Sequence, residues 1–188
     1  MEAGDRRRPN PSSLKKGGIK TVTPLMHTHN ETLVHAPLES CLDAASDVER
    51  WPSILPHYRR VRFSRQDGPG CGRVRMEAIR HFGRLPYPIW WESDMVTDFE
   101  GAEVRYRHVA GITTGMDVVW KLEPRPEGTY IAILHDWSGP RWPILGGVAA
   151  RSVIGPRFVH VVAARTLSGI KRAAEAAEAG TETPGDNT

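Results

Sequence analysis

The chain has 188 residues, with 39% hydrophobic and 25% charged side chains, which suits one globular domain and leaves little for a second. It contains no run of about 18 apolar residues, and no apolar core follows the arginines near its start, so neither a transmembrane helix nor a secretory signal is expected. The net charge is +3, but residues 1–25 hold six basic and two acidic side chains, so the rest is about −1 and is not a basic nucleic-acid-binding domain.

The two ends of the chain have the composition of disordered segments. Residues 1–25 are rich in Pro, Gly, Ser and Lys and predict a basic disordered tail, and residues 181–188 predict a shorter one. We therefore place the folded domain at residues 26–180. Its two cysteines, Cys41 and Cys71, are too few for a disulfide framework, so we expect reduced thiols and a cytoplasmic protein.

The first expected elements are a strand and a helical region. Residues 27–36 suit a strand, and Pro37 then occupies a first-turn helix position, where its missing N–H has no consequence. Apolar residues at helical spacing predict a helix over residues 38–51. Pro52 and Pro56 break the following chain into short pieces.

A series of strands follows, each with apolar residues on alternate positions. A glycine-rich turn at residues 68–72 and further turns at 100–101 and 126–128 join them. Such short connections require antiparallel pairing, because parallel neighbours need long crossovers. The residues expected on common inward faces are Val61 and Phe63; Val74, Met76 and Ala78; Ile89, Trp91 and Met95; Val104, Tyr106 and His108; and Met116, Val118, Trp120 and Leu122.

The C-terminal part of the domain is expected to be helical. An apolar stretch runs from about Ile144 to Glu178, and Pro156 divides it into a short and a long helix. In the long helix an amphipathic pattern near 3.6 residues per turn predicts one buried face. That face comprises Phe158, Val161, Val162, Arg165, Leu167, Ile170 and Ala174.

This order of elements resembles a known superfamily. Residues 35–61, HAPLESCLDAASDVERWPSILPHYRRV, are similar to the opening of the START-like, helix-grip (SRPBCC) superfamily, in its polyketide cyclase/dehydrase and coenzyme Q-binding branch. Trp120 matches a recurrent tryptophan on a late strand, and residues 161–175, VVAARTLSGIKRAAE, resemble the closing helix. The resemblance spans about residues 28–178. It implies an α+β fold in which a curved antiparallel sheet of six to seven strands, with two short helices after the first, wraps around a long C-terminal helix.

The resemblance also implies a cavity between sheet and helix, which gives meaning to polar residues on apolar faces. We expect the pocket to be lined by Tyr58, Met76, Arg80, Trp91, Met95, Tyr106, His108, Val118, Trp120 and His135. Tyr58 follows the proline-bounded pieces, a region that resembles the pocket mouth of the family. We also expect residues 142–155 to form a mobile short helix near the cavity entrance, because proline and glycines bound an apolar segment there.

Alternation leaves several of these orientations open. Arg80 shares parity with Ala78 but lies near the turn at Gly83, so it is either inward or an exposed strand-end arginine. His108 is either a core or rim histidine or a ligand contact. His135 lies on a strand where both parities are apolar, so its direction is not predicted. Trp91 and Trp120 are core or pocket wall, and the resemblance favours the wall.

Some members of the branch are aromatase/cyclases, in which tyrosine, arginine and histidine groups steer aldol closure and dehydration. The residues implied for such a role are Arg80, Tyr106 and His108. The chain departs from the cyclase pattern at Met95, where an arginine is expected after the tryptophan strand. No cofactor is implied. No metal site is expected either, because His27, His29 and His35 lack a converging set of donors and are expected on the surface.

Three functions fit these observations. The first is a non-catalytic carrier or chaperone for a polyketide, quinone or lipid, which needs only a cavity. The second is a cyclase or dehydratase acting on a polyketide intermediate, which needs polar groups converging on the ligand. The third is an interaction module acting through the basic tail. The expected partner is a hydrophobic small molecule, with transient contact to a membrane or acyl carrier as a further option. No nucleic acid is expected for the folded domain, and the sequence leaves the oligomeric state open.

Overall fold

A computed structural model describes residues 26–82, 85–139 and 156–181. The elements follow the order that the sequence predicts: a strand, short helices, six strands and a long helix. They are β1 (Met26–Val34), α1 (Leu38–Ser46), the 3₁₀ turn η1 (Val48–Arg50), α2 (Trp51–Ile54), β2 (Tyr58–Gly68), β3 (Cys71–Phe82), β4 (Leu85–Asp98), β5 (Glu103–Gly111), β6 (Asp117–Arg125), β7 (Gly128–Trp137) and α4 (Pro156–Thr181).

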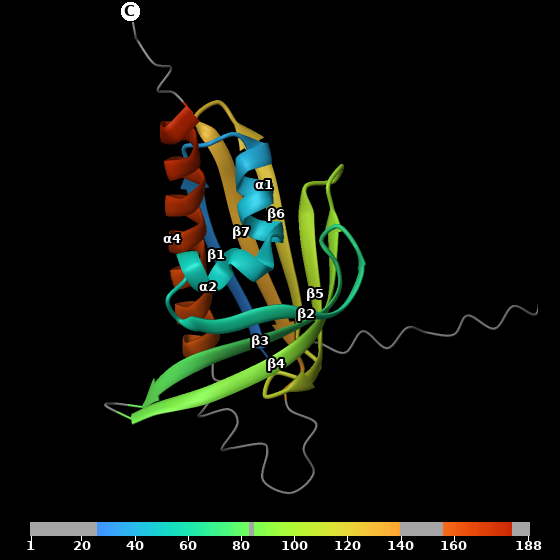
Figure 1. The fold of residues 1–188 in the computed structure, drawn as a ribbon. Coiled ribbons are helices and arrows are strands. Elements are labelled where there is room, and N and C mark those ends of the chain that lie inside the picture. The colour runs from blue at the N-terminus through green and yellow to red at the C-terminus, as the bar shows by residue number, and fades with distance from the viewer. Residues whose placement is uncertain (1–25, 83–84, 140–155, 182–188) are drawn as a thin grey trace, which may run out of the picture.

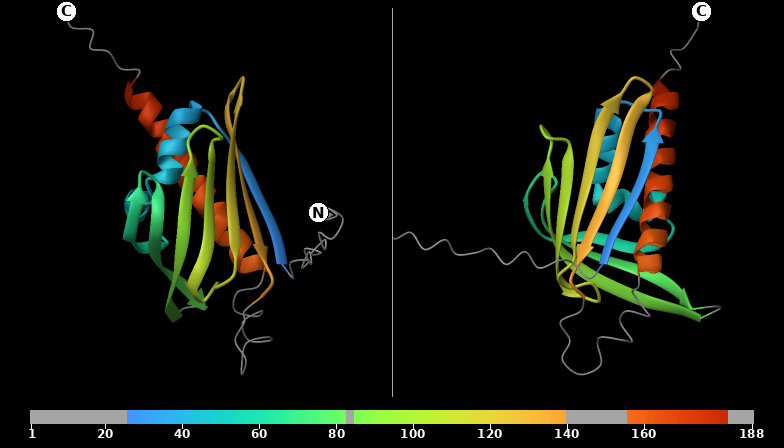
Figure 2. Two further views of the ribbon diagram at one scale, coloured as in Figure 1. Left: turned by 90° about the vertical axis from the view of Figure 1, so that its right-hand side faces the viewer. Right: turned by 180° about the vertical axis from the view of Figure 1, so that it is seen from behind.

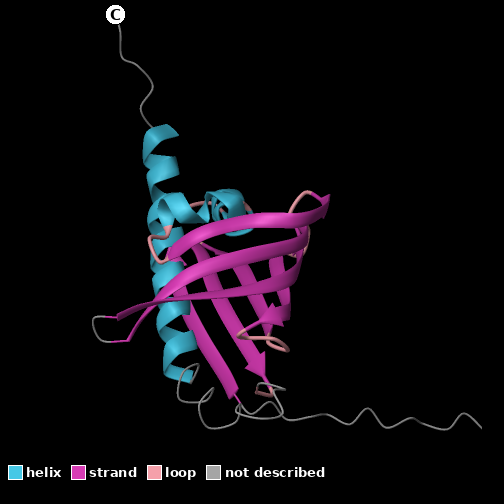
Figure 3. Ribbon diagram, turned by 60° about the horizontal axis from the view of Figure 1, so that its bottom comes forward, coloured by secondary structure: helices cyan, strands magenta, loops and turns pink. Residues whose placement is uncertain are grey.

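The seven strands form one antiparallel sheet in the order β1-β7-β6-β5-β4-β3-β2. Each strand from β2 to β7 pairs with the next one along the chain, and β1 pairs with β7, so that β1 and β2 form the two edges of the sheet. The sheet is strongly bent, so that β2, β3 and β4 arch across the direction of the remaining strands (Figures 1 and 3). Helices α1, α2 and α4 all lie on its concave side (Figure 2). The helix-grip arrangement implied by the resemblance is therefore confirmed.

Polar contacts fasten α4 along β1. The Asn30 side-chain amide donates to the His160 carbonyl at 3.2 Å, and Lys171 Nζ donates to the Leu33 carbonyl at 2.6 Å. The backbone N–H of His35, just after β1, donates to the Glu175 carboxylate at 2.9 Å. These three bonds connect α4 to β1 at several points along the helix.

The alternation predicted for the middle strands is confirmed. The inward residues of β3 to β6 are buried, whereas Trp90, with the opposite parity, is 41% exposed and stacks under the Arg75 guanidinium. Phe63 is only half-buried, because β2 is an edge strand with irregular register toward its end. Cys41 is buried, Cys71 is half-buried, and both are free thiols.

The single helix predicted over residues 38–51 is divided. Pro37 caps α1 with extended backbone angles, φ −58° and ψ 156°, and its carbonyl accepts from the N–H of Cys41 at 3.1 Å. Asp47 leaves the helical region, with φ −79° and ψ 69°, and η1 and α2 follow as short turns. The break lets Trp51 fold back, so that its indole N–H donates to the Ala44 carbonyl at 3.1 Å.

Helix α4 starts at Pro156, where a division was predicted, and ends at Thr181. Its buried face is not the predicted one throughout. Leu167, Ile170 and Ala174 are buried, together with Val159, Ala163 and Thr166. Val161 is 45% exposed and Arg165 is exposed, because they lie on the flank of the helix, off the buried stripe.

The predicted tails, residues 1–25 and most of 181–188, and the short helix predicted at 142–155 lie outside the described residues. Among the helices that the structure describes, none is long and apolar enough to cross a membrane.

Candidate ligand cavity

A cavity of 490 Å³ lies between the concave face of the sheet and the first part of α4. Its walls come from α2, from the strands β2 to β7, and from α4 between Arg157 and Thr166. Residues farther along the same inward faces, such as Val104, Leu122 and Ile131, close the core and do not line it. The core is therefore filled at one end of the sheet and hollow at the other.

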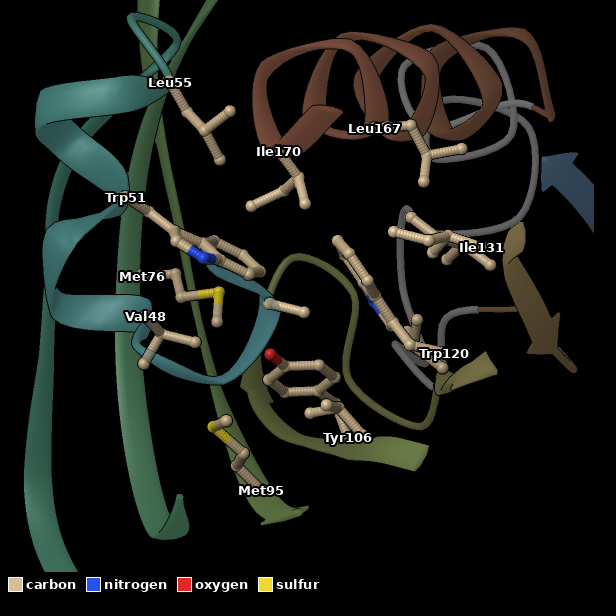
Figure 4. Packing of buried hydrophobic residues seen from close by; sticks show 14 of the residues in the cluster. Val48, Trp51, Leu55, Met76, Met95, Tyr106, Trp120, Ile131, Leu167 and Ile170 are labelled. Atoms are coloured by element: carbon tan, nitrogen blue, oxygen red, sulfur yellow. The ribbon is translucent and has the colours of Figure 1, made fainter. Parts of the chain in front are cut away.

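Aromatic rings form a continuous wall of this cavity. The Trp51 ring lies 5.7 Å from Trp120 and 5.3 Å from Tyr58, measured between centroids, and Tyr58 lies 6.0 Å from Trp91. Figure 4 shows Trp51 and Trp120 facing each other below α4, with the Tyr106 hydroxyl pointing toward the Trp51 side. Such tilted rings present flat apolar surfaces, which suit a planar or extended unsaturated ligand.

His108 closes one end of the aromatic wall. Its ring stacks on Trp91, with centroids 6.0 Å apart and planes 19° apart, and its Nδ1 lies 2.6 Å from the Thr113 hydroxyl. Burial, and after it the nearby His135 and Arg107, lower the pKa of His108 to about 3. At neutral pH this imidazole is uncharged. Its second nitrogen can therefore form a hydrogen bond with a ligand without carrying a charge.

His135 stands beside His108 in the same wall, on β7. Its Nδ1 lies 3.2 Å from the Thr28 hydroxyl, and burial lowers its pKa to about 4. Both imidazoles line the cavity, and each has one nitrogen engaged by a threonine. Two neutral imidazoles thus face the same space from β5 and β7.

The Tyr106 hydroxyl is a buried polar group without a partner. Within the part of the chain that the structure describes, this oxygen makes no hydrogen bond, although the residue is only 5% exposed. Burial, with Tyr58 nearby, raises the pKa of Tyr106 well above its usual value, so the phenol stays protonated. A buried hydroxyl left unpaired is uncommon in native proteins, and this one borders a cavity.

A second polar group lies where α4 meets the start of β2. The Thr166 hydroxyl donates to the Val162 carbonyl at 2.9 Å. His57 Nε2 lies 3.1 Å from the hydroxyl oxygen of Thr166. The tautomer that agrees with both contacts has His57 donating from Nε2, which leaves Nδ1 as an acceptor. Burial, and then Arg165, lower the pKa of His57 to about 4.

The structure brings together most of the predicted site residues. The cavity is lined by Tyr58, Met76, Trp91, Tyr106, His108, Val118, Trp120 and His135. Met95 is different: it is fully buried, 1% exposed, and lies outside the lining. It shares the face of Trp91 but sits four residues farther along β4, opposite Tyr106, where the core is filled. Arg80 lies on β3 opposite Tyr87, and its side chain is outside the described part.

Several lining residues escaped sequence reasoning. Trp51, His57, Arg157, Arg165 and Thr166 come from α2, the following turn and α4, where strand alternation gives no information. The Trp51-Pro52 pair within the family-like opening segment was the available indication. His27, expected on the surface, pairs with Asp136 at 2.7 Å, and the residues searched hold no group of three His, Cys, Asp or Glu side chains that could bind a metal ion.

Comparison with known proteins places this geometry in context. A family model described as "Polyketide cyclase / dehydrase and lipid transport" matches residues 26–175. A protein of Streptomyces halstedii, described as "Putative polyketide cyclase", is 35% identical over 107 residues, which are 54% of this chain and 92% of the relative. A protein of Streptomyces cyaneus with the same description is 31% identical over 115 residues, covering 60% of this chain and 72% of the relative.

Solved structures show the same fold. The Zhui aromatase/cyclase from Streptomyces sp. R1128 matches with a TM-score of 0.72 at 18% identity, over 85% of this chain and 99% of that one. A START superfamily protein from Mycobacterium smegmatis matches with a TM-score of 0.57 at 17% identity, over 82% and 98% of the two chains. At these identities the likeness concerns the fold alone.

Proposed function

Because the chain belongs to the polyketide cyclase/dehydrase and lipid transport family, we propose that its cavity binds a hydrophobic small molecule of the polyketide, quinone or lipid class. The observation that supports this most is the 490 Å³ cavity itself, a size typical of small-molecule sites. Its aromatic wall suits flat rings, and its few polar groups suit oxygen atoms on those rings. Among the three classes, a polyketide fits best, since two relatives are described as putative polyketide cyclases.

A second function, cyclisation or dehydration of the bound molecule, is favoured by a specific observation. The neutral imidazole of His108 and the unpartnered hydroxyl of Tyr106 line one cavity. The phenol can donate a hydrogen bond to a carbonyl oxygen that becomes negative, and the neutral imidazole can form a second hydrogen bond to an oxygen of the same ligand. This pairing goes beyond what a carrier needs. The role predicted for Arg80 stays a prediction, because its side chain lies outside the described part, and Met95 stands where the cyclase pattern expects an arginine.

The binding proposal is tested by filling the cavity. Ala78 is 5% exposed and lines the cavity, so Ala78→Trp places an indole inside it. Val96, on the outer face of β4, is 53% exposed, and Val96→Trp adds the same group outside. The probe is N-phenyl-1-naphthylamine, an uncharged dye whose fluorescence rises in apolar sites.

We expect saturable dye binding by the original protein and by Val96→Trp, and at least about tenfold weaker binding by Ala78→Trp. Mass spectrometry of organic extracts from the same three proteins then identifies any co-purified molecule. Dye binding that is equal in all three proteins, or absent from the original, contradicts a ligand cavity. The transient membrane or acyl-carrier contact and the interaction role of residues 1–25 stay predictions.

A further inference from the structure

The α4 side of the cavity carries positive charge. Arg157, Val161 and Arg165 follow one another at four-residue intervals, so they form a row along one side of the helix. All three line the cavity, and all three are exposed at its edge. The row therefore borders both the apolar interior and the solvent.

In the part of the chain that the structure describes, no carboxylate pairs with either arginine. Among the described residues, Arg157 and Arg165 form no ion pair and no side-chain hydrogen bond, and the lining contains no Asp or Glu. Several arginines on β3 and β5 are paired instead. Arg73 holds Asp94 at 2.8 Å, Arg75 holds Glu77 at 3.1 Å, and Arg107 pairs with Asp117. Unpaired guanidinium groups beside a low-dielectric cavity focus a positive potential into it.

Arg165 is the better placed of the two arginines. Their Cα atoms lie about 12 Å apart along the helix axis, so the two side chains reach the cavity edge at different heights. Arg165 adjoins Thr166 and acts electrostatically on His57, and these two residues form the polar group at this edge. Arg157 has no comparable polar neighbour among the lining residues of the first turn, which are Phe158 and Val159.

From this arrangement we propose that the cavity's ligand bears a negatively charged end, and that Arg165 binds that end at the cavity edge while the apolar body lies against the tryptophans. This rests on the proposed binding function and deepens it by naming the charge of the ligand. A carboxylate and a phosphate share the required chemistry, since both accept paired hydrogen bonds from a guanidinium.

Two dyes with one ring framework test the proposal. 8-Anilinonaphthalene-1-sulfonate carries a negative sulfonate that N-phenyl-1-naphthylamine lacks. We expect Arg165→Ala to weaken binding of the sulfonate dye about tenfold and to leave binding of the uncharged dye within about twofold. Arg165→Glu should weaken the sulfonate dye further, since it reverses the charge. Ala78→Trp should abolish both signals, which assigns them to the cavity.

The matched control is Arg172→Ala. Arg172 is an exposed arginine two turns farther along α4, it bonds to Ser168 at 2.9 Å, and it does not line the cavity. Its removal changes the net charge equally but should not change either affinity. If Arg165→Ala and Arg172→Ala have the same effect on the sulfonate dye, the anion role of Arg165 is wrong while the cavity stands. If the uncharged dye fails to bind the original protein, the binding function itself fails, and this inference with it.

Competition distinguishes the two anion sources. 2-Naphthoate and 2-naphthyl phosphate are each titrated against the bound uncharged dye, with 2-naphthol as the neutral reference. Tighter competition by either anion than by naphthol, lost in Arg165→Ala, supports the proposal, and the stronger of the two indicates a carboxylate or a phosphate. Equal competition by all three contradicts it.

Discussion

The imidazole of His108 lies nearly parallel to the indole of Trp91, with centroids 6.0 Å and planes 19° apart. The tryptophan covers one face of the imidazole, and Thr113 engages one of its nitrogens at 2.6 Å. These contacts exclude water from the imidazole and leave one ring nitrogen of His108 to interact with a ligand. Much of the expected behaviour of the cavity follows from that relationship.

The first prediction concerns the dependence of stability on pH. Burial lowers the pKa of His108 from 6.5 to about 3 in the folded state, so between these values the unfolded chain binds more protons than the folded one. The contribution of His108 is therefore fully present above pH 6.5 and is lost as the pH falls toward 3. Urea unfolding from pH 7 to 5 should show a slope of at most about 1.4 kcal/mol per pH unit from this residue. His108→Gln should remove that part of the slope, and an unchanged slope would contradict the buried neutral state.

The second prediction separates function from stability at Tyr106. Its hydroxyl is buried without a partner among the described residues, so Tyr106→Phe removes an unsatisfied polar group. We expect the midpoint of thermal unfolding to stay the same or to rise, while affinity for an oxygenated ring ligand such as 2-naphthol falls. Tyr130→Phe is the control, because Tyr130 bonds Glu31 on the outer surface at 2.5 Å. A marked loss of stability in Tyr106→Phe would mean that the hydroxyl has a structural partner.

The sequence predicted the faces of the strands well and positions along them less well. A period of two residues decides which side of a sheet a residue occupies, and this held for Met76, Trp91, Tyr106 and Trp120. It does not reveal how far along the strand the core is filled. Met95 therefore shares the correct face and still misses the cavity.

The helical part of the site was harder to predict for a different reason. Trp51 and His57 flank the short segment from Pro52 to Pro56, where no periodic pattern exists to orient a side chain. On α4 the pattern near 3.6 residues per turn gives one buried stripe, but a cavity beside the helix makes its flank functional. Arg165 falls next to the apolar positions in this pattern and was therefore predicted on the buried face, but the structure places it on the exposed flank that borders the cavity.

The third prediction tests the boundary between core and cavity. Met95 is 1% exposed within filled core, whereas Met76 is 3% exposed and borders the cavity. Met95→Ala should destabilise the protein by about 2–5 kcal/mol and leave the affinity for N-phenyl-1-naphthylamine unchanged. Met76→Ala enlarges an existing space, so it should destabilise less and alter dye affinity. Urea unfolding and dye titration on both variants check this, and a reversal of the two patterns would place the boundary elsewhere.

The fourth prediction concerns the proton on His57. Thr166 uses its hydroxyl proton for the Val162 carbonyl, which obliges His57 to donate from Nε2. Long-range ¹H–¹⁵N NMR spectra at pH 7 should therefore show one tautomer, protonated at Nε2. Thr166→Val keeps the shape and removes the acceptor, so the ring should become a mixture of tautomers, while Thr166→Ser should preserve the original one.

The same His57 resonances report on charge at Arg165. Burial and the Arg165 guanidinium together hold the pKa of His57 at about 4. An anion bound to Arg165 offsets the positive field and should raise this pKa, whereas an uncharged ligand only removes water and should lower it or leave it unchanged. Titrations with 2-naphthyl phosphate, which stays negatively charged at pH 4, and with 2-naphthol should thus shift the His57 midpoint in different directions. A shift in the same direction with both ligands would mean that burial alone controls the pKa of His57. Arg165→Ala should abolish the upward shift. If the upward shift persists in that variant, the anion acts on the histidine directly and not through the arginine.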